Sequence, residues 1–230
     1  MGVARTRTLL DPDEFQRRTV ARFERTPVET KDGDLLHDLV ARLPADGGTI
    51  RLGPGRYYLQ ADLTIDRPDV EIVGNREAII DVGIHTLTMG FTGSGIRGCS
   101  VRGVAGHTAY LVVLGSTNCY LDHCYLPGVV DRQVRMDGNR TRVESCTWPD
   151  VGTDTLIYGV RGNRGITIRN NNMDGAADRA LDLIFVENPT DNGGATATFV
   201  LIDNNWTESR ITYPVAQTTY GDNVATPRAV

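Results

Sequence analysis

Residues that can donate or accept protons recur at the start of short segments in which polar and apolar residues alternate. In the alignment that we expect, four segments begin at His107, Asp131, Asp154 and Asp178. Four residues further along them stand Leu111, Arg135, Tyr158 and Asp182. If the segments are stacked parallel strands, equivalent carboxylates lie about 4.8 Å apart, close to the separation of about 5–5.5 Å in retaining glycosidases. Asp154, Asp178 and Asp182 are therefore the candidate acid, base or nucleophile of a glycan-cleaving enzyme.

The same aspartates have a second interpretation as turn residues. An aspartate before a strand commonly caps a turn by accepting backbone N–H bonds, and Arg132, Arg135 and Arg179 stand near enough in the sequence to neutralise the row. The carboxylate oxygens would also suit Ca²⁺ if carbonyls or water completed six or more ligands. The sequence favours the turn role. We therefore predict no catalytic residue, no metal and no cofactor, with catalysis and Ca²⁺ binding as the alternatives.

The elements that position these residues are indicated by a repeat. Five segments share one pattern: an apolar residue, two intervening residues, Cys or Asn, one more residue, and a large apolar side chain. The Cys or Asn residues are Cys99, Cys124, Cys146, Asn171 and Asn204. They are spaced by 25, 22, 25 and 33 residues; the first three steps suit one turn of a parallel β-helix, and the last predicts an insertion at residues 188–194. We predict that they stack as a structural ladder whose cysteines are buried free thiols.

Alternation within the acidic segments predicts which side chains point into the coil. In the four segments the expected inward residues are Tyr110 and Val112, Val134 and Met136, Ile157 and Gly159, and Leu181 and Leu183. The leading aspartates and the residues four places later would then face outward or lie at a corner.

Outside the repeat, the sequence predicts four parts. Residues 1–30 form an arm with a short helix that begins at Asp11 and ends before Pro27. Residues 31–46 contain a second helix, whose leucines and valine at helical spacing would cap the open end of the apolar bore. Residues 47–210 form the parallel β-helix, and residues 211–230 lose the pattern and are expected to be a C-terminal tail.

The run GGTIRLGPGRYYL at residues 47–59 places a Gly-Pro-Gly turn between two short strands. With VEIVGN at residues 70–75, it resembles the opening of pectate-lyase-like proteins, which share the pectin lyase-like fold. The resemblance covers roughly residues 33–206 and implies an all-β, single-stranded, right-handed parallel β-helix. Such proteins include polysaccharide lyases, glycoside hydrolases, epimerases, phage tailspikes and non-catalytic virion proteins. The Gly-His-Gly and Arg-Ile-Lys motifs of polygalacturonase-like hydrolases are absent from the sequence.

Composition narrows the function further. The net charge of −5 argues against a general nucleic-acid binder. No apolar run follows Met1, so we expect neither a signal peptide nor a membrane anchor. The resulting hypothesis is a non-catalytic, phage-type virion protein made in the host cytoplasm, as head decoration or minor capsid protein or as a tail appendage. It would self-assemble, with a trimer favoured, on a capsid or tail. The alternatives are a polysaccharide-acting glycoside hydrolase or lyase and bare polysaccharide binding.

Overall fold

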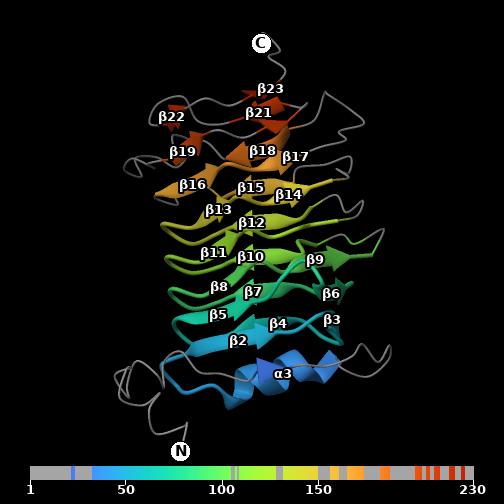
Figure 1. The fold of residues 1–230 in the computed structure, drawn as a ribbon. Coiled ribbons are helices and arrows are strands. Elements are labelled where there is room, and N and C mark those ends of the chain that lie inside the picture. The colour runs from blue at the N-terminus through green and yellow to red at the C-terminus, as the bar shows by residue number, and fades with distance from the viewer. Residues whose placement is uncertain are drawn as a thin grey trace, which may run out of the picture.

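The chain winds into a parallel β-helix whose short strands stack in rungs along one axis (Figure 1). The structure, a computed structural model, describes residues 33–104, 107, 109–127, 132–149, 156–160, 165–173 and 182–186, together with strand residues 22–23, 200–203, 206–207, 210–212, 218–220 and 224–225. All strand pairs among these residues are parallel. The all-β solenoid predicted from the repeat is therefore confirmed.

Three sheets form the sides of the solenoid, and the one that we name sheet A has 9 strands among the described residues. Its strands, in stacking order, are β1 (Arg22–Phe23), β2 (Gly48–Leu52), β5 (Val70–Val73), β8 (Gly95–Arg97), β11 (Tyr120–Asp122), β13 (Arg142–Glu144), β16 (Ile166–Arg169), β19 (Val200–Asp203) and β22 (Thr218–Tyr220). Neighbours in this order are about one coil apart in the sequence, which is why every pairing is long-range.

Sheets B and C complete each rung. Sheet B contains β3 (Gly55–Tyr58), β6 (Ala78–Gly83), β9 (Ser100–Gly103), β14 (Thr147–Trp148), β17 (Asn172–Met173), β20 (Trp206–Thr207) and β23 (Val224–Ala225). Its two halves are joined by Tyr125, which bridges Ser100 and Thr147. Sheet C contains β4 (Leu63–Ile65), β7 (Leu87–Met89), β10 (Val112–Leu114), β12 (Val134–Met136), β15 (Ile157–Gly159), β18 (Asp182–Val186) and β21 (Arg210–Thr212).

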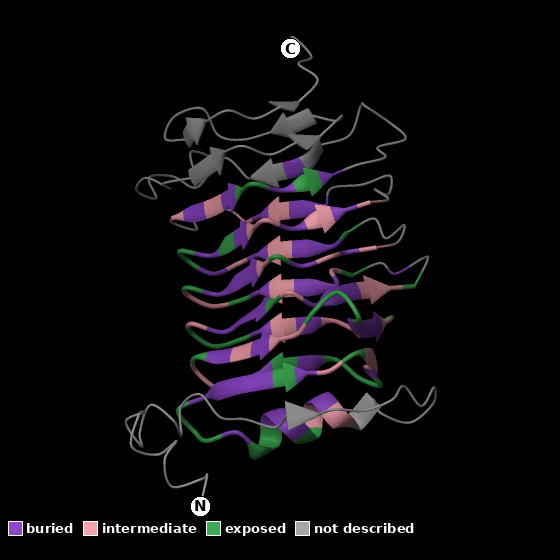
Figure 2. Ribbon diagram, in the orientation of Figure 1, coloured by how far each residue is buried: buried purple, intermediate pink, exposed green. Residues whose placement is uncertain are grey.

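Apolar side chains from the three sheets fill the bore of the solenoid, and buried positions recur along each rung (Figure 2). In sheet A, Ile96, Leu121, Val143 and Ile168 pair in successive rungs, and each is fully buried. Removing apolar surface from water stabilises the fold by roughly 25 cal/mol per Å². Because each of these side chains is covered by those of the rungs above and below, the rungs stabilise one another.

The helix α3 (Gly33–Arg42) closes the N-terminal end of this bore, as the sequence predicts. Its apolar face buries Leu36, Leu39 and Val40 against the first rung. Arg67 secures the end of the helix, where carbonyl groups lack helical partners: its guanidinium donates to the carbonyl oxygens of Leu43 and, at 3.1 Å, Ala41. No helix in the described part of the chain is long and apolar enough to cross a membrane.

The two ends of the coil differ from the prediction. Arg22 and Phe23, expected on a short helix, form β1, which pairs with Arg51 and Leu52 in sheet A. A strand there satisfies backbone groups at the sheet edge that a helix would leave unpaired. The coil also continues beyond residue 210, because β21, β22 and β23 extend the three sheets into the predicted tail. The rest of residues 1–30 and of the tail lies outside the described residues.

Sharp corners between sheets are made by residues with left-handed backbone, a conformation uncommon for residues other than glycine. At the corner from sheet A to sheet B these residues are Gly98, His123, Ser145 and Asn170, with φ of 75°, 52°, 55° and 55°. Each of them immediately precedes a member of the Cys/Asn ladder. The repeat in the sequence therefore marks a repeated turn.

Stacking at another corner depends on a glycine. The N–H of Gly138 donates to the carbonyl oxygen of Leu114 at 2.9 Å, and a Cβ at Gly138 would lie 1.9 Å from the carbonyl oxygen of Ser116. We expect Gly138→Ala to lower the free energy of unfolding by about 1–3 kcal/mol, because backbone must move to admit the methyl group.

Urea denaturation of both variants at the same corner tests this expectation. The matched control is Gly115→Ala, one rung earlier, where the nearest atom to a Cβ is 3.4 Å away. Its expected change stays within about 0.5 kcal/mol. Equal destabilisation by the two substitutions would show that the close approach at Gly138 does not limit the stacking.

Candidate functional site

The predicted acidic row is only partly within the described residues. Asp154 and Asp178, as well as Asp131, lie outside them. Asp182 is the first residue of β18, where its backbone pairs with Arg210; its side chain is not described. The described residues therefore provide no geometry for a catalytic carboxylate pair.

The strand register differs from the alignment that defines the row. Ile157 pairs with Ile184, whereas the alignment that produced the row matches Ile157 with Leu181. Asp178 consequently stands three residues further ahead of its paired strand than Asp154 does. The physical reason is that apolar residues fill most of positions 181–186, so that several registers satisfy the inward pattern. Ile184, which is fully buried, occupies the inward place.

At the start of the row the alignment is wrong by two residues. Val112 pairs with Val134, a partner that the alignment assigns to Tyr110, and Tyr110 is half-buried instead of pointing into the core. Leu111, expected outside, is fully buried. His107 is also buried, and its ring nitrogens lie 2.7 Å from the carbonyl oxygen of Ala109 and 2.9 Å from that of His85. His107 therefore ties its loop to the preceding rung.

The outer surface of sheet C carries a Tyr–Arg cluster, which we define as Tyr110, Arg135, Asp137 and Tyr158. The two tyrosine ring centroids are 6.0 Å apart, and the Arg135 guanidinium carbon lies 5.8 Å from the Tyr110 centroid. Arg135 donates from Nε to Asp137 Oδ1 at 2.6 Å, and this hydrogen bond raises the pKa of Arg135. Arg135 and Tyr158 are paired neighbours, as expected. The cluster exposes aromatic surface, but its one carboxylate, that of Asp137, is paired with Arg135.

Sheet A carries a row of charges on its outer surface. Arg97 reaches Glu71 Oε1 at 2.9 Å on the preceding rung and Asp122 Oδ2 at 3.4 Å on the following one. Further along, Arg169 Nε lies 2.8 Å from Glu144 Oε1. The sequence contains a signal for this row, because Arg97, Asp122, Glu144 and Arg169 occupy one position in the repeated segments. These ion pairs join successive rungs.

Tyr120 packs between rungs on the same surface. A Cβ at Gly95 would lie 2.6 Å from the ring of Tyr120, so the ring covers the Gly95 backbone, while Arg142 approaches it from the next rung at 4.6 Å. Its hydroxyl donates to Glu71 Oε1 at 2.7 Å. Burial, followed by the hydrogen bond and charge of Glu71, raises the pKa of Tyr120. The Tyr120 hydroxyl therefore has a structural role, because a phenol with a raised pKa transfers protons poorly near neutral pH.

The predicted ladder residues in the described part of the chain, Cys99, Cys124, Cys146 and Asn171, are all buried. Asn171 accepts a hydrogen bond from the N–H of Cys146 at 2.9 Å and donates to the carbonyl oxygen of Val143 at 3.0 Å. The cysteines are free thiols, and burial raises the pKa of Cys99 and of Cys146. The thiols of Cys99 and Cys146 are therefore poor nucleophiles.

The sequence alignment places the last ladder member one residue too early. Asn204 itself lies outside the described residues, but Ile168 pairs with Ile202 and Met173 with Thr207, each one residue later than the alignment predicts. By this register the counterpart of Asn171 is Asn205. One more residue than the alignment predicts therefore lies between β16 and β19.

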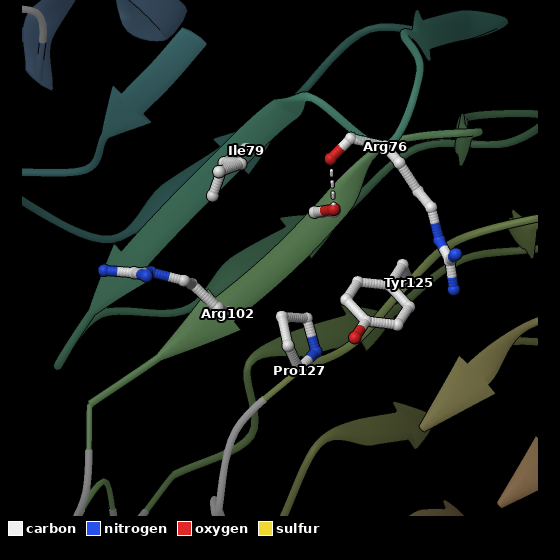
Figure 3. A pocket seen from close by; sticks show the side chains of 6 residues that line it. Arg76, Ile79, Arg102, Tyr125 and Pro127 are labelled. Carbon is white, nitrogen blue, oxygen red and sulfur yellow. Dashed lines mark hydrogen bonds between the residues drawn. The ribbon is translucent and has the colours of Figure 1, made fainter. Parts of the chain in front are cut away.

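The described part of the chain has a hollow on the outside of sheet B (Figure 3). No sequence motif indicates it. It has a volume of about 290 Å³ and is lined by Arg76, Ile79, Ser100, Arg102, Tyr125 and Pro127. We name it the sheet B hollow. The lining residues come from three successive rungs, so the hollow forms only when the rungs stack. A local sequence motif therefore cannot indicate it.

In the described part of the chain, no group of three or more His, Cys, Asp or Glu side chains is placed to hold a metal ion. Comparison with known proteins adds no relative: no protein-family model matches the sequence, and no curated protein or solved structure matches the chain. The parallel β-helix is established by the strand pairing, whereas the likeness to pectate-lyase-like proteins stands as a resemblance in sequence.

Proposed function

We propose that the chain is a non-catalytic structural protein of a phage-type virion, which assembles with copies of itself on a capsid or tail. One observation carries the proposal: acids on the outer strand surfaces are held by arginines of the same chain. Arg97 holds Glu71 and Asp122, Arg169 holds Glu144, Arg102 holds Asp81, and Arg135 holds Asp137. Such pairs leave fewer lone pairs for proton transfer or for a metal, and all but the pair of Arg135 with Asp137 join successive rungs.

The N-terminal end of the solenoid is covered, which favours assembly through the sides of the solenoid. α3 covers the bore there, and β1 occupies the edge of sheet A. A second copy at this end would therefore meet the helix and not an open apolar bore. Contact along the flanks with parallel axes gives a closed cyclic oligomer, and we favour a trimer. The virion setting derives from the resemblance to phage proteins.

The competing function is a glycoside hydrolase or lyase that uses Asp154, Asp178 and Asp182. The acidic row on which it depends comes from an alignment that pairs Ile157 with Leu181, whereas the strands pair Ile157 with Ile184. Bare polysaccharide binding is compatible with a structural role and does not compete with it.

Sedimentation velocity of the purified chain, combined with a glycan-cleavage panel, tests the two functions. We expect a discrete oligomer, no turnover of acidic or neutral glycans, and unchanged folding and assembly in the double variant Asp154→Asn/Asp178→Asn. A monomer across the accessible concentration range would contradict the assembly role. Turnover by the wild type that the double variant loses would establish the enzyme instead.

A further inference from the structure

We propose that the thiols of Cys124 and Cys146 bind a soft metal ion in a linear, two-coordinate geometry. The two cysteines occupy equivalent places on successive rungs, because Tyr125, which follows Cys124, pairs with Thr147, which follows Cys146. Equivalent residues of adjacent parallel strands lie about 4.8 Å apart. The two side chains therefore stack along the axis of the solenoid.

Contacts with the backbone place the two sulfur atoms one rung apart. Cys124 Sγ lies 3.3 Å from a carbonyl oxygen of its own rung and 3.6 Å from that of Ile96 on the preceding rung. Cys146 Sγ has the corresponding distances of 3.2 Å and, to the oxygen of Leu121, 3.7 Å. Ile96 and Leu121 are paired neighbours, so the two sulfurs have the same surroundings. The two cysteine side chains also interact with each other.

The spacing of the sulfurs suits one ion between them. A metal–sulfur bond of about 2.3 Å gives a linear S–metal–S unit that spans about 4.6 Å, close to one rung. A disulfide would need the sulfurs about 2.0 Å apart, and both thiols are free. Within the described ranges, no three His, Cys, Asp or Glu side chains gather around a possible ion. The ion must therefore be one that two ligands satisfy.

Burial and charge select a soft divalent ion. Thiolates prefer soft cations, and both cysteines are only 1% exposed. When a divalent ion replaces the two thiol protons, the products are a neutral RS–metal–SR unit and two protons released to water. A monovalent ion would leave a net negative charge in the core, which is costly. Hg²⁺ has the charge, the softness and the linear preference, whereas Zn²⁺ takes four ligands.

The sulfurs are buried but lie directly beneath a turn at the surface. His123 and Ser145, which immediately precede the two cysteines, have left-handed backbone, and the His123 side chain is 68% exposed. Opening of this turn exposes the thiols while the three sheets stay paired. An ion can therefore enter without unfolding of the chain.

Titration of the full chain with Hg²⁺ in excess N-acetylcysteine tests the site, with the ultraviolet absorption of mercury–thiolate bonds as the readout. The competitor removes ions held by one sulfur, so we expect the wild type to retain one ion per chain. Cys124→Ala and Cys146→Ala should each weaken the binding by about tenfold or more, because the pair is lost. The matched controls Cys99→Ala and Cys119→Ala should bind as the wild type does. The sulfur of Cys99 does not repeat the arrangement of the pair, since it lies 3.6 Å from the oxygen of Arg97 on its own rung.

X-ray absorption of the wild-type complex gives a second measurement, which does not depend on any variant. We expect two sulfur ligands at one distance and no nitrogen or oxygen ligand. The proposal is overturned if the wild type loses its ion to the competitor, if Cys124→Ala keeps it, if a third ligand is found, or if Zn²⁺ displaces Hg²⁺. Circular dichroism and thermal unfolding of the ion-free variants show whether each one folds. None of these results depends on the oligomeric state, so they are independent of the proposed virion role.

Discussion

Replacing Asn171 by alanine should lower the free energy of unfolding by about 2–4 kcal/mol, because two backbone groups lose their partners in the core. The side chain is buried, accepts from the N–H of Cys146 and donates to the carbonyl oxygen of Val143. Alanine fills neither role. The adjacent Cys146 is also buried, so bulk water does not reach the two backbone groups in the native fold.

The neighbouring asparagine provides the matched control. Asn172 is exposed in β17, so Asn172→Ala should change the stability by no more than about 0.5 kcal/mol. Chemical denaturation of both variants, followed by circular dichroism, gives the comparison. Similar losses for the two variants would mean that the ladder asparagine is not a specific part of the fold and that its recurrence has another cause.

The parts of the fold that the sequence predicts are those encoded by residues close together in the chain. Ile96, Leu121 and Val143 were placed in register because the Cys residue that follows each of them marks the same turn. Where the coil length changes, the same method fails by one residue, as at Asn204. The position of an insertion within a coil cannot be read from the periodicity on either side of it.

The acidic row shows a second limit. Alternation alone aligns Ile157 with Leu181. The run from 181 to 186 contains apolar residues at both odd and even positions, so alternation does not identify the inward ones. Only packing in the assembled stack selects Ile184. The sheet B hollow lay beyond prediction for a related reason. Arg76, Arg102 and Tyr125 belong to different rungs, and their contacts depend on the register that brings the rungs together.

Removing the guanidinium of Arg102 should lower the free energy of unfolding by about 3 kcal/mol in Arg102→Gln, since it leaves a buried carboxylate without its counter-charge. Asp81 is 5% exposed and Arg102 34% exposed. The cost is at the low end for a buried pair because water reaches the arginine side. The N–H of Gly83, 3.3 Å from Asp81 Oδ1, is too weak a partner to replace the ion pair.

Two further variants distinguish the destabilisation caused by an unpaired buried charge from that caused by lost side-chain packing. Asp81→Asn/Arg102→Gln should be more stable than Arg102→Gln alone, because no unpaired charge stays in the sheet. Arg97→Gln removes a second arginine that joins two rungs, but Arg97 is 48% exposed, so its loss should cost less than about 1 kcal/mol. If the double variant is as unstable as Arg102→Gln, the contribution of Arg102 comes from its packing, and the ion pair does not fix the rim of the sheet B hollow.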